Sequence, residues 1–408
     1  MMTNETLKKI ANEYGTPSYV FDFEEVRNRA GSIKRILNSE ATSPIRLCFS
    51  IKANPFLIPA LIDTVDYFEV CSPGELSICK DYHVPSGKII YSGVHKEIED
   101  IREAICYEPD FKGGYLPVAL ITAESLRHYE MIKQVATSEQ VPVKLLLRLS
   151  SKSQFGMSME DIETIICSAS SEHWLEITGL HYFAGTQRAK LKHQKEELLE
   201  LKEAFSMLRE KYAIPLSHFE YGPGLPYPYF FGDDFSDTLA PVKELAPALW
   251  EVSAYSELTI EMGRFIASSC GTYLTSVCDL KSSYDHNWCI LDGGINHVNF
   301  IGQMMGLKCP KCRILKTDGS AVDIDFENPS KKWTMCGSLC STNDVLIRDF
   351  PGGELNIGDI LAIENIGAYS VTEGIYLFLS RDMPSIIVHD KDTVSLVREV
   401  KHTWKLNL

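Results

Sequence analysis

The amino-acid sequence predicts an α/β fold, a (β/α)8 barrel of parallel strands joined to a smaller, mostly antiparallel β domain. The chain has 408 residues, which is too long for one ordinary domain but suits a barrel with a partner domain. From about residue 45 to 262, β-rich runs alternate with amphipathic stretches, which is the pattern of βαβ units. Beyond residue 264, strand-like runs follow one another with Gly, Asp and Asn turns and few helical periods.

The barrel prediction rests on eight strand-like runs, because eight parallel strands can close on themselves. These runs are residues 46–50, 67–71, 88–92, 118–122, 143–148, 177–183, 218–221 and 257–261. Between them lie helical candidates with turn residues at their ends, among them 73–80, 124–135, 159–169 and 194–212.

The β domain is predicted from runs with little helical periodicity, at residues 273–280, 288–291, 360–364 and 385–388. A further strand signal at 17–21 precedes the barrel, and we expect it to cross over and join the β domain. The predicted domains are therefore a barrel over 28–264 and a β-sandwich or β-barrel domain built from 1–27 and 265–408.

Composition narrows the classes of function. A formal net charge of −15, without a basic block, argues against nucleic acid as a partner. No apolar run is long enough to span a membrane and the first residues lack a secretory pattern, so we expect a cytoplasmic protein. The twelve cysteines are expected to be reduced. Cys309 and Cys312, with Cys336 and Cys340 downstream, could be read as zinc ligands, but buried or loop thiols are favoured and no metal is expected.

Lys52 is the first candidate catalytic residue. It directly follows the strand-like run 46–50, and in such barrels the reactive groups lie where strands end. Its neighbours are apolar, a setting that favours Schiff-base chemistry by an amine. A single lysine after a strand is usually a solvated surface residue, so the position alone does not establish a function.

The residues around Lys52 carry a resemblance to a known family. The stretch LCFSIKAN at 47–54 resembles the lysine motif of the diaminopimelate/ornithine/arginine decarboxylases, which are pyridoxal 5'-phosphate (PLP) enzymes of fold type III with an alanine-racemase-like barrel. Eight other motifs follow that family's order: YGTPSYV (14–20), EVCSPGE (69–75), GLHYFAGTQ (179–187), GPG (222–224), EMGR (261–264), DGG (292–294), CGSLCSTND (336–344) and GAY (367–369). The chain therefore resembles a divergent, diaminopimelate decarboxylase-like member.

The resemblance implies a PLP-dependent amino-acid decarboxylase that works through Schiff-base and quinonoid chemistry. Lys52 would bind the cofactor, and Glu261 would face the pyridine nitrogen. Gly222 and Gly224 suit a phosphate loop, since glycines let backbone N–H groups approach closely. The resemblance adds further cofactor-binding residues: His181, Phe183, Thr186, Gly263, Arg264 and Tyr369. For DGG at 292–294, tight turns are the favoured interpretation.

The resemblance also implies a homodimer with shared active sites. Cys340 would reach the neighbouring subunit and return a proton to the substrate carbon. This assignment rests on the resemblance and on Asp344 four residues later, because a free cysteine is more often a small apolar residue. The expected substrate-binding residues are Asn299, Ser341, Asp344 and Tyr369.

Two departures from the family pattern concern the cofactor ring and the substrate. Phe183 stands where relatives carry a stacking histidine, and His181 faces the same side of its strand and could take over part of that role. The arginine and tyrosine that follow DGG in diaminopimelate decarboxylases are absent, and Ser341 replaces an acidic residue. A neutral or carrier-tethered amino acid is therefore expected, in a site lined by Asn296, His297, Asn299 and Gln303.

Three alternatives remain open from the sequence. The first is a meso-diaminopimelate decarboxylase despite these losses, and the second is an amino-acid racemase on the same fold, although the motifs of alanine racemases are not apparent. The third is a non-catalytic cofactor carrier, in which residues 265–408 would have no purpose.

Overall fold

The computed structural model describes residues 2–110, 113–169, 172–298, 307–320, 322 and 324–408. The chain forms two compact units. The barrel unit contains Arg29–Tyr227 and Asp237–Ile266. The β unit contains Met1–Asn28, Pro228–Ser236 and Ala267–Leu408. Within the described residues, no helix has the length and apolar character needed to cross a membrane.

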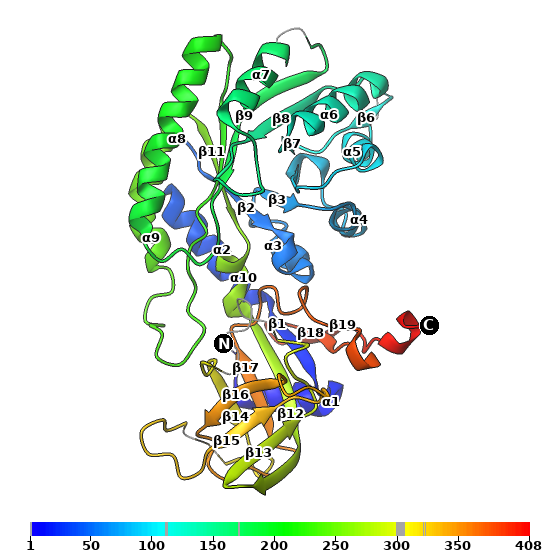
Figure 1. Ribbon diagram of the computed structural model, residues 1–408, viewed down its shortest axis with the longest axis vertical. Helices are drawn as coiled ribbons and strands as arrows, with labels where there is room; N and C mark the ends of the chain where they lie inside the picture. Colours follow the sequence, from blue (N-terminus) through cyan, green and yellow to red (C-terminus); the bar gives the residue numbers. More distant parts are fainter. Residues whose placement is uncertain (1, 111–112, 170–171, 299–306, 321, 323) are drawn as a thin grey trace. The chain divides into compact units, whose positions relative to one another are not determined.

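The barrel unit is a closed barrel of eight parallel strands, in the order β10-β11-β2-β3-β4-β7-β8-β9. Helices lie on the outside of these strands (Figure 1). All eight predicted runs form strands of this barrel, so that part of the fold prediction is confirmed. The strands are β2 (Arg46–Ser50), β3 (Tyr67–Val70), β4 (Ile89–Tyr91), β7 (Leu120–Ala123), β8 (Val143–Arg148), β9 (Leu175–Phe183), β10 (His218–Gly222) and β11 (Glu257–Met262).

Helices connect these strands, and local capping explains several of their starts. Ser72 accepts a hydrogen bond from Glu75 N before Pro73 opens α4, and Ser125 does the same for His128 N at the start of α6. The helices are α2 (Phe23–Asn38), α3 (Ile58–Leu61), α4 (Pro73–Asp81), α5 (Ile98–Ile105), α6 (Leu126–Glu139), α7 (Met159–Ala169), α8 (Leu191–Tyr212), α9 (Ala240–Ser253) and α10 (Arg264–Ala267). A short hairpin, β5 (Glu108–Pro109) with β6 (Tyr115–Leu116), lies outside the barrel sheet.

The β unit holds one mixed sheet whose central path runs β16-β15-β13-β12-β1-β18-β19, with β17 joining β12 to β14. Most pairings are antiparallel, and the parallel ones are β1 with β18 and β13 with β15. The strands are β1 (Ser18–Asp22), β12 (Gly271–Ser283), β13 (His286–Leu291), β14 (Cys312–Leu315), β15 (Trp333–Cys336), β16 (Val345–Phe350), β17 (Ile360–Glu364), β18 (Ser385–Asp390) and β19 (Thr393–Arg398). A mostly antiparallel domain was predicted, and this prediction is confirmed.

Strand β1 joins the sheet of the β unit, as predicted. Tyr19 is paired with Tyr273 of β12 on one side and with Ile386 of β18 on the other. Helix α1 (Asn4–Tyr14) covers this region, and its residues Leu7 and Ile10 belong to a buried apolar cluster with the strands β1, β12, β17 and β18. The N-terminal segment is therefore part of the β unit's core.

Candidate active site

The inner face of the barrel changes from apolar to polar toward the carboxyl ends of the strands. One buried cluster joins four strands that are not all neighbours, through Cys48, Ile90, Leu120 and Leu146. Side chains two positions later on a strand point to the same side. The residues two positions after these four are Ser50, Ser92, Thr122 and Arg148. The barrel is thus filled by an apolar layer, above which a polar layer can meet a ligand.

Lys52 lies at this polar end, in a 3-10 turn (Ile51–Ala53) directly after β2. Its Nζ lies 2.5 Å from Glu69 Oε2 and 3.4 Å from Cys71 Sγ. Burial by itself would raise the pKa of Glu69, but the charge and hydrogen bond of Lys52 lower it to about 2. The amine therefore lies against a carboxylate and a thiol from the end of β3, a contact that its apolar sequence neighbours did not suggest.

The turn after β3 is fixed by two hydrogen bonds. Ser72 Oγ accepts from Glu75 N at 3.2 Å, and Glu75 Oε2 accepts from Cys71 N at 2.7 Å. Ser72 is thus the N-cap of α4, while Glu75 binds the backbone N–H of Cys71, the residue before this N-cap. This second bond holds the backbone of Cys71 in place, and thereby the thiol beside the Lys52 amine.

Glu261 lies near the end of β11 and is 8% exposed. Its Oε2 lies 3.3 Å from His181 Nε2 of β9. A Cβ atom added at Gly222 would come within 2.3 Å of Glu261 Oε1 and 2.5 Å of Phe183 Cδ2. Gly222 therefore leaves the space that both side chains occupy. His181 is 1% exposed and bonded to Glu261, which makes it a partner of this carboxyl group rather than a replacement for a stacking ring.

The loops that follow β9 and β10 are tied together. Gly224 has a φ of +59°, and a Cβ atom there would come within 1.8 Å of Gly185 O. The Gln187 side chain donates to Tyr227 O at 2.9 Å and accepts from Tyr227 N at 2.7 Å. Only glycine fits a left-handed backbone position so close to a carbonyl group. The two loops thus form one glycine-containing rim.

Thr186 and Arg264, two predicted phosphate ligands, lie together at this rim. Arg264 Nε donates to Thr186 Oγ1 at 3.3 Å. Gly263 directly precedes Arg264, in the turn between β11 and α10. A hydroxyl group, a guanidinium group and exposed backbone N–H groups of Gly-rich loops are the donors that bind phosphate in proteins. The structure thus brings these residues together within the barrel unit.

The remaining predicted site residues belong to the β unit. Cys340 and Ser341 are exposed in the loop between β15 and β16. Tyr369 is half-buried and has a φ of +66°. Asp344 is 2% exposed and accepts hydrogen bonds from Ile295 N at 2.9 Å and Leu339 N at 2.7 Å. Asp344 therefore holds the backbone of the cysteine loop against the turn at 292–296.

The expected polar substrate lining is only partly described. Asn296 and His297 are 1% and 2% exposed, and their side chains lie 2.9 Å apart. His297 Nδ1 also lies 2.8 Å from the Tyr273 hydroxyl, and burial lowers its pKa to about 4. These two side chains hold a buried loop, which corrects the expectation that they line an open site. Asn299 and Gln303 lie outside the described residues.

Several buried charged residues of the barrel were not identified from the sequence. Glu69 pairs with Lys52, and Arg148 NH1 donates to Glu124 Oε1 at 3.0 Å. Lys96 is 3% exposed, its Nζ donates to Gly93 O at 2.5 Å, and burial lowers its pKa to about 8. Glu220 is fully buried. The sequence does carry a signal for such residues, which is a charged residue on the inward side of an otherwise apolar strand, as at Glu69 and Glu220.

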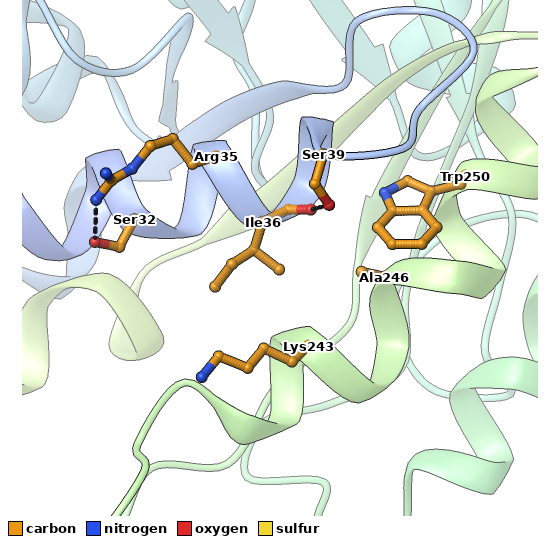
Figure 2. A pocket seen from close by; sticks show the side chains of 7 residues that line it. All are labelled: Ser32, Arg35, Ile36, Ser39, Lys243, Ala246 and Trp250. Atoms are coloured by element: carbon orange, nitrogen blue, oxygen red, sulfur yellow. Dashed lines mark hydrogen bonds between the residues drawn. The ribbon is translucent and has the colours of Figure 1, made fainter.

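A hollow on the outside of the barrel unit offers less chemistry. A shallow hollow of about 460 Å³ between α2 and α9 is lined by Ser32, Arg35, Ile36, Ser39, Lys243, Ala246 and Trp250 (Figure 2). These seven residues include no carboxylate, imidazole or thiol. Among the described residues, no three His, Cys, Asp or Glu side chains are grouped to hold a metal ion. The polar end of the barrel is therefore the candidate active site.

The residues at this end fit PLP. The cofactor needs an amine for its aldehyde, a carboxylate toward its ring nitrogen and a phosphate cradle. Lys52, Glu261 and the Thr186–Arg264 pair at the glycine rim supply these groups. The close approach of Gly224 to Gly185, which any larger residue would prevent, is the observation that supports a phosphate cradle.

Comparisons with known proteins agree with this chemistry. Residues 24–268 match the family model described as "Pyridoxal-dependent decarboxylase, pyridoxal binding domain". Diaminopimelate decarboxylase from Aquifex aeolicus is 22% identical, covering 97% of this chain and 91% of the relative. L-glutamyl-[BtrI acyl-carrier protein] decarboxylase from Niallia circulans is 24% identical, covering 95% of this chain and 92% of the relative.

Solved structures show the same fold. The crystal structure of diaminopimelate decarboxylase from M. jannaschii in co-complex with L-lysine superposes with a TM-score of 0.83. The superposition covers 98% of this chain and 93% of that chain, at 22% identity. At this identity the likeness concerns the fold, and it extends over both units.

Proposed function

This chain belongs to the pyridoxal-dependent decarboxylase family, and on this premise we propose that it decarboxylates a neutral or carrier-tethered amino acid. Its fold and its cofactor, PLP, agree with the expectations from the sequence. The observation that carries the proposal is the convergence of Lys52, Glu261 and the Thr186–Arg264 pair at one end of the barrel.

Within this proposal each group has a separate task. When bound, PLP withdraws electrons from the substrate carbon that loses carbon dioxide. Lys52 would bind the cofactor, and Glu261 would stabilise a proton on its ring nitrogen. Arg264 and Thr186 bind the phosphate group, with Gly222 and Gly224 keeping the neighbouring backbone close. Phe183, which stands where relatives carry a stacking histidine, would lie beside the ring and, lacking a polar atom, could neither donate nor accept a proton.

The substrate proposal rests on charges that the chain lacks. No arginine or tyrosine stands in the stretch after Gly294 that corresponds to the family's distal-carboxylate grip, and Ser341 is uncharged. A buried or enclosed charge on a substrate needs an opposite partner, so a substrate with a charged distal end would be disfavoured. The name of the N. circulans relative, a decarboxylase of a carrier-bound glutamyl group, supports a tethered substrate as one possibility.

We further propose a homodimer in which Cys340 donates a proton in the active site of the partner subunit. The exposed position of this thiol supports such a role, because a group that acts on another subunit cannot be buried in its own. Asp344 supports the loop that carries it. We also propose that residues 28–264 form the cofactor-binding barrel and that residues 1–27 and 265–408 form the β domain. The twelve cysteines form no disulfide, in keeping with a reducing, cytoplasmic location.

Carbon dioxide release tests the substrate. Purified enzyme loaded with PLP is incubated with meso-diaminopimelate, L-lysine, L-ornithine, L-arginine, a set of neutral amino acids, and L-glutamate attached to a carrier protein. We expect the fastest release from a neutral or carrier-attached substrate. Fastest release from meso-diaminopimelate would reject the substrate proposal, and loss of optical activity without gas release would indicate a racemase.

Decarboxylation of meso-diaminopimelate is the second candidate. It is favoured by the names of several relatives, including the proteins from A. aeolicus and Methanocaldococcus jannaschii. The two candidates differ in one measurable quantity, the ratio of kcat/KM for meso-diaminopimelate to that for the best neutral substrate.

A further inference from the structure

Glu220 is a buried carboxyl group that no role proposed above uses. It lies in the middle of β10, is 0% exposed, and neither of its oxygens has a hydrogen-bond partner among the described residues. The neighbouring side chains of β10 show its direction. Phe219 packs against Phe205 of α8, and the Tyr221 hydroxyl donates to Glu197 of the same helix. Because side chains alternate along a strand, Glu220 faces the barrel interior.

His181 lies beside Glu220 with one ring nitrogen unpaired. The two residues are register partners across the β9–β10 pairing. Tyr182 stacks on Tyr221 outside the barrel, so His181 also faces inward. Its Nε2 contacts Glu261, whereas its Nδ1 has no partner among the described residues. Paired strands lie about 4.8 Å apart, so the two residues are neighbours across the strand pairing, although no hydrogen bond joins their side chains in the structure.

The charge around Glu220 indicates its protonation state. Burial raises the pKa of Glu220 well above its ordinary value, and the carboxylates of Glu261 and Glu69 raise it further. Lys52 and Arg148, the cations that face it, act in the opposite direction. A buried, unpaired carboxylate is costly, so the neutral acid is the stable form.

We propose that Glu220, His181 and Glu261 form a hydrogen-bonded relay at the floor of the active site. A rotation of the Glu220 side chain would bring its O–H, as that of a neutral acid, to His181 Nδ1, which has no other partner among the described residues. The His181 Nε2–H in turn donates to Glu261. The relay holds two protons, one on the Glu220 carboxyl group and one on the His181 imidazole. If the Glu220 proton moves to His181 Nδ1, the result is an imidazolium between two carboxylates, and the relay still holds two protons.

Within this relay Glu220 and His181 are positioning residues. They fix the imidazole tautomer and hold Glu261 by one oxygen, so that its other oxygen would be available to the cofactor's ring nitrogen. This consequence rests on the proposed role of Glu261. The hydrogen bonds of the relay join side chains of the protein only, so they can be tested without cofactor or substrate.

Infrared spectroscopy of the cofactor-free protein tests the protonation of Glu220. Near neutral pH, we expect wild type to show a carbonyl band of a protonated carboxyl group that is lost in Glu220→Gln. Thr259→Val is the matched control, because Thr259 is also buried, pairs with Glu220 from β11 and bonds to His218 instead. The band should persist in this control. A band of equal intensity in wild type and Glu220→Gln would overturn the proposal.

Kinetics of the PLP-loaded enzyme test the positioning role. In Glu220→Leu no donor remains for Nδ1, so we expect kcat to fall roughly 10- to 100-fold with KM within about threefold of wild type. Glu220→Gln still carries an N–H donor and should recover most of this loss. If Glu220→Leu does not fold, the Glu220→Gln variant and the infrared band still decide the question. Equal kcat values for Glu220→Leu and Thr259→Val would reject the relay.

These outcomes separate the relay from the proposed function. An enzyme that releases no carbon dioxide from any substrate would contradict the proposed function, yet the infrared band would still report on Glu220. Conversely, an active decarboxylase without the protonated-carboxyl band would leave the proposed function intact and remove the relay.

Discussion

Replacing Gly224 by alanine should damage both folding and cofactor binding. Gly224 has a φ of +59°, a conformation that costs a residue with a Cβ atom about 1–2 kcal/mol. The added Cβ would lie 1.8 Å from Gly185 O, closer than any real contact of this kind, so the two loops must move apart by more than about 1 Å. Overpacking of this kind adds about 1–3 kcal/mol, for a total loss of about 2–5 kcal/mol.

The displacement also reaches the phosphate site, because Thr186 directly follows Gly185 in the chain. We therefore expect PLP to bind at least about tenfold more weakly, a change of about 1.4 kcal/mol. Urea unfolding of the cofactor-free protein and absorbance titration with PLP measure the two effects.

Gly31→Ala is the matched control for this substitution. Gly31 lies inside α2, and a Cβ atom there meets nothing within 4 Å. Alanine should therefore stabilise the helix by up to about 1 kcal/mol, without changing PLP binding. A Gly224→Ala protein as stable as wild type would refute the steric argument, and a destabilised protein with normal PLP affinity would refute the phosphate cradle.

Three further predictions concern charged or reactive residues. Arg264→Gln should raise the dissociation constant of PLP about tenfold or more but leave that of pyridoxal, which lacks the phosphate, nearly unchanged by absorbance titration. Glu69 has a pKa lowered from 4.5 to about 2, so its ion pair with Lys52 stabilises the cofactor-free protein above pH 4.5, and this stability is lost as the pH falls toward 2. Acid unfolding of wild type and Glu69→Gln should therefore show a difference in stability that shrinks between pH 4.5 and 2. A difference that stays constant over this range would contradict the ion pair. If active sites are shared between subunits, mixing inactive Lys52→Ala and Cys340→Ala proteins should restore about a quarter of wild-type activity. No recovery of activity, although the subunits have exchanged, would argue against shared sites.

The fold was largely accessible from sequence because barrel strands carry strong local signals. Each of the eight runs is apolar, short and bounded by turn residues, and β2 and β8 have the predicted limits. The sequence predicts two shorter strands, 273–280 and 288–291, where the structure has the hairpin of β12 and β13. Its turn uses Tyr284 and Asp285, with φ values of 49° and 62°, where Asn-Gly is the usual sequence. Without that signal, the ends of both strands could not be located.

The site was only partly accessible, because contacts between strands depend on register. Lys52, Glu261 and Thr186 lie in motifs that the sequence displays. The ion pair of Lys52 with Glu69 requires β2 and β3 to be neighbours, and their register sets Ser50 opposite Glu69. The contact between His181 and Glu261 likewise crosses the barrel interior from β9 to β11. Periodicity identifies which side of a strand faces inward, but not which inward groups meet.

The place of β1 in its sheet has a consequence for how the protein is made. Ser18 of β1 pairs with Leu274 of β12 and with Ser385 of β18, residues that the ribosome adds more than 250 and more than 350 positions later. The first strand to leave the ribosome must therefore wait for almost the whole chain before both of its edges are covered. During that interval its exposed edges could pair with other chains, so the slowest and most aggregation-sensitive step of biogenesis is expected to be completion of this sheet rather than closure of the barrel.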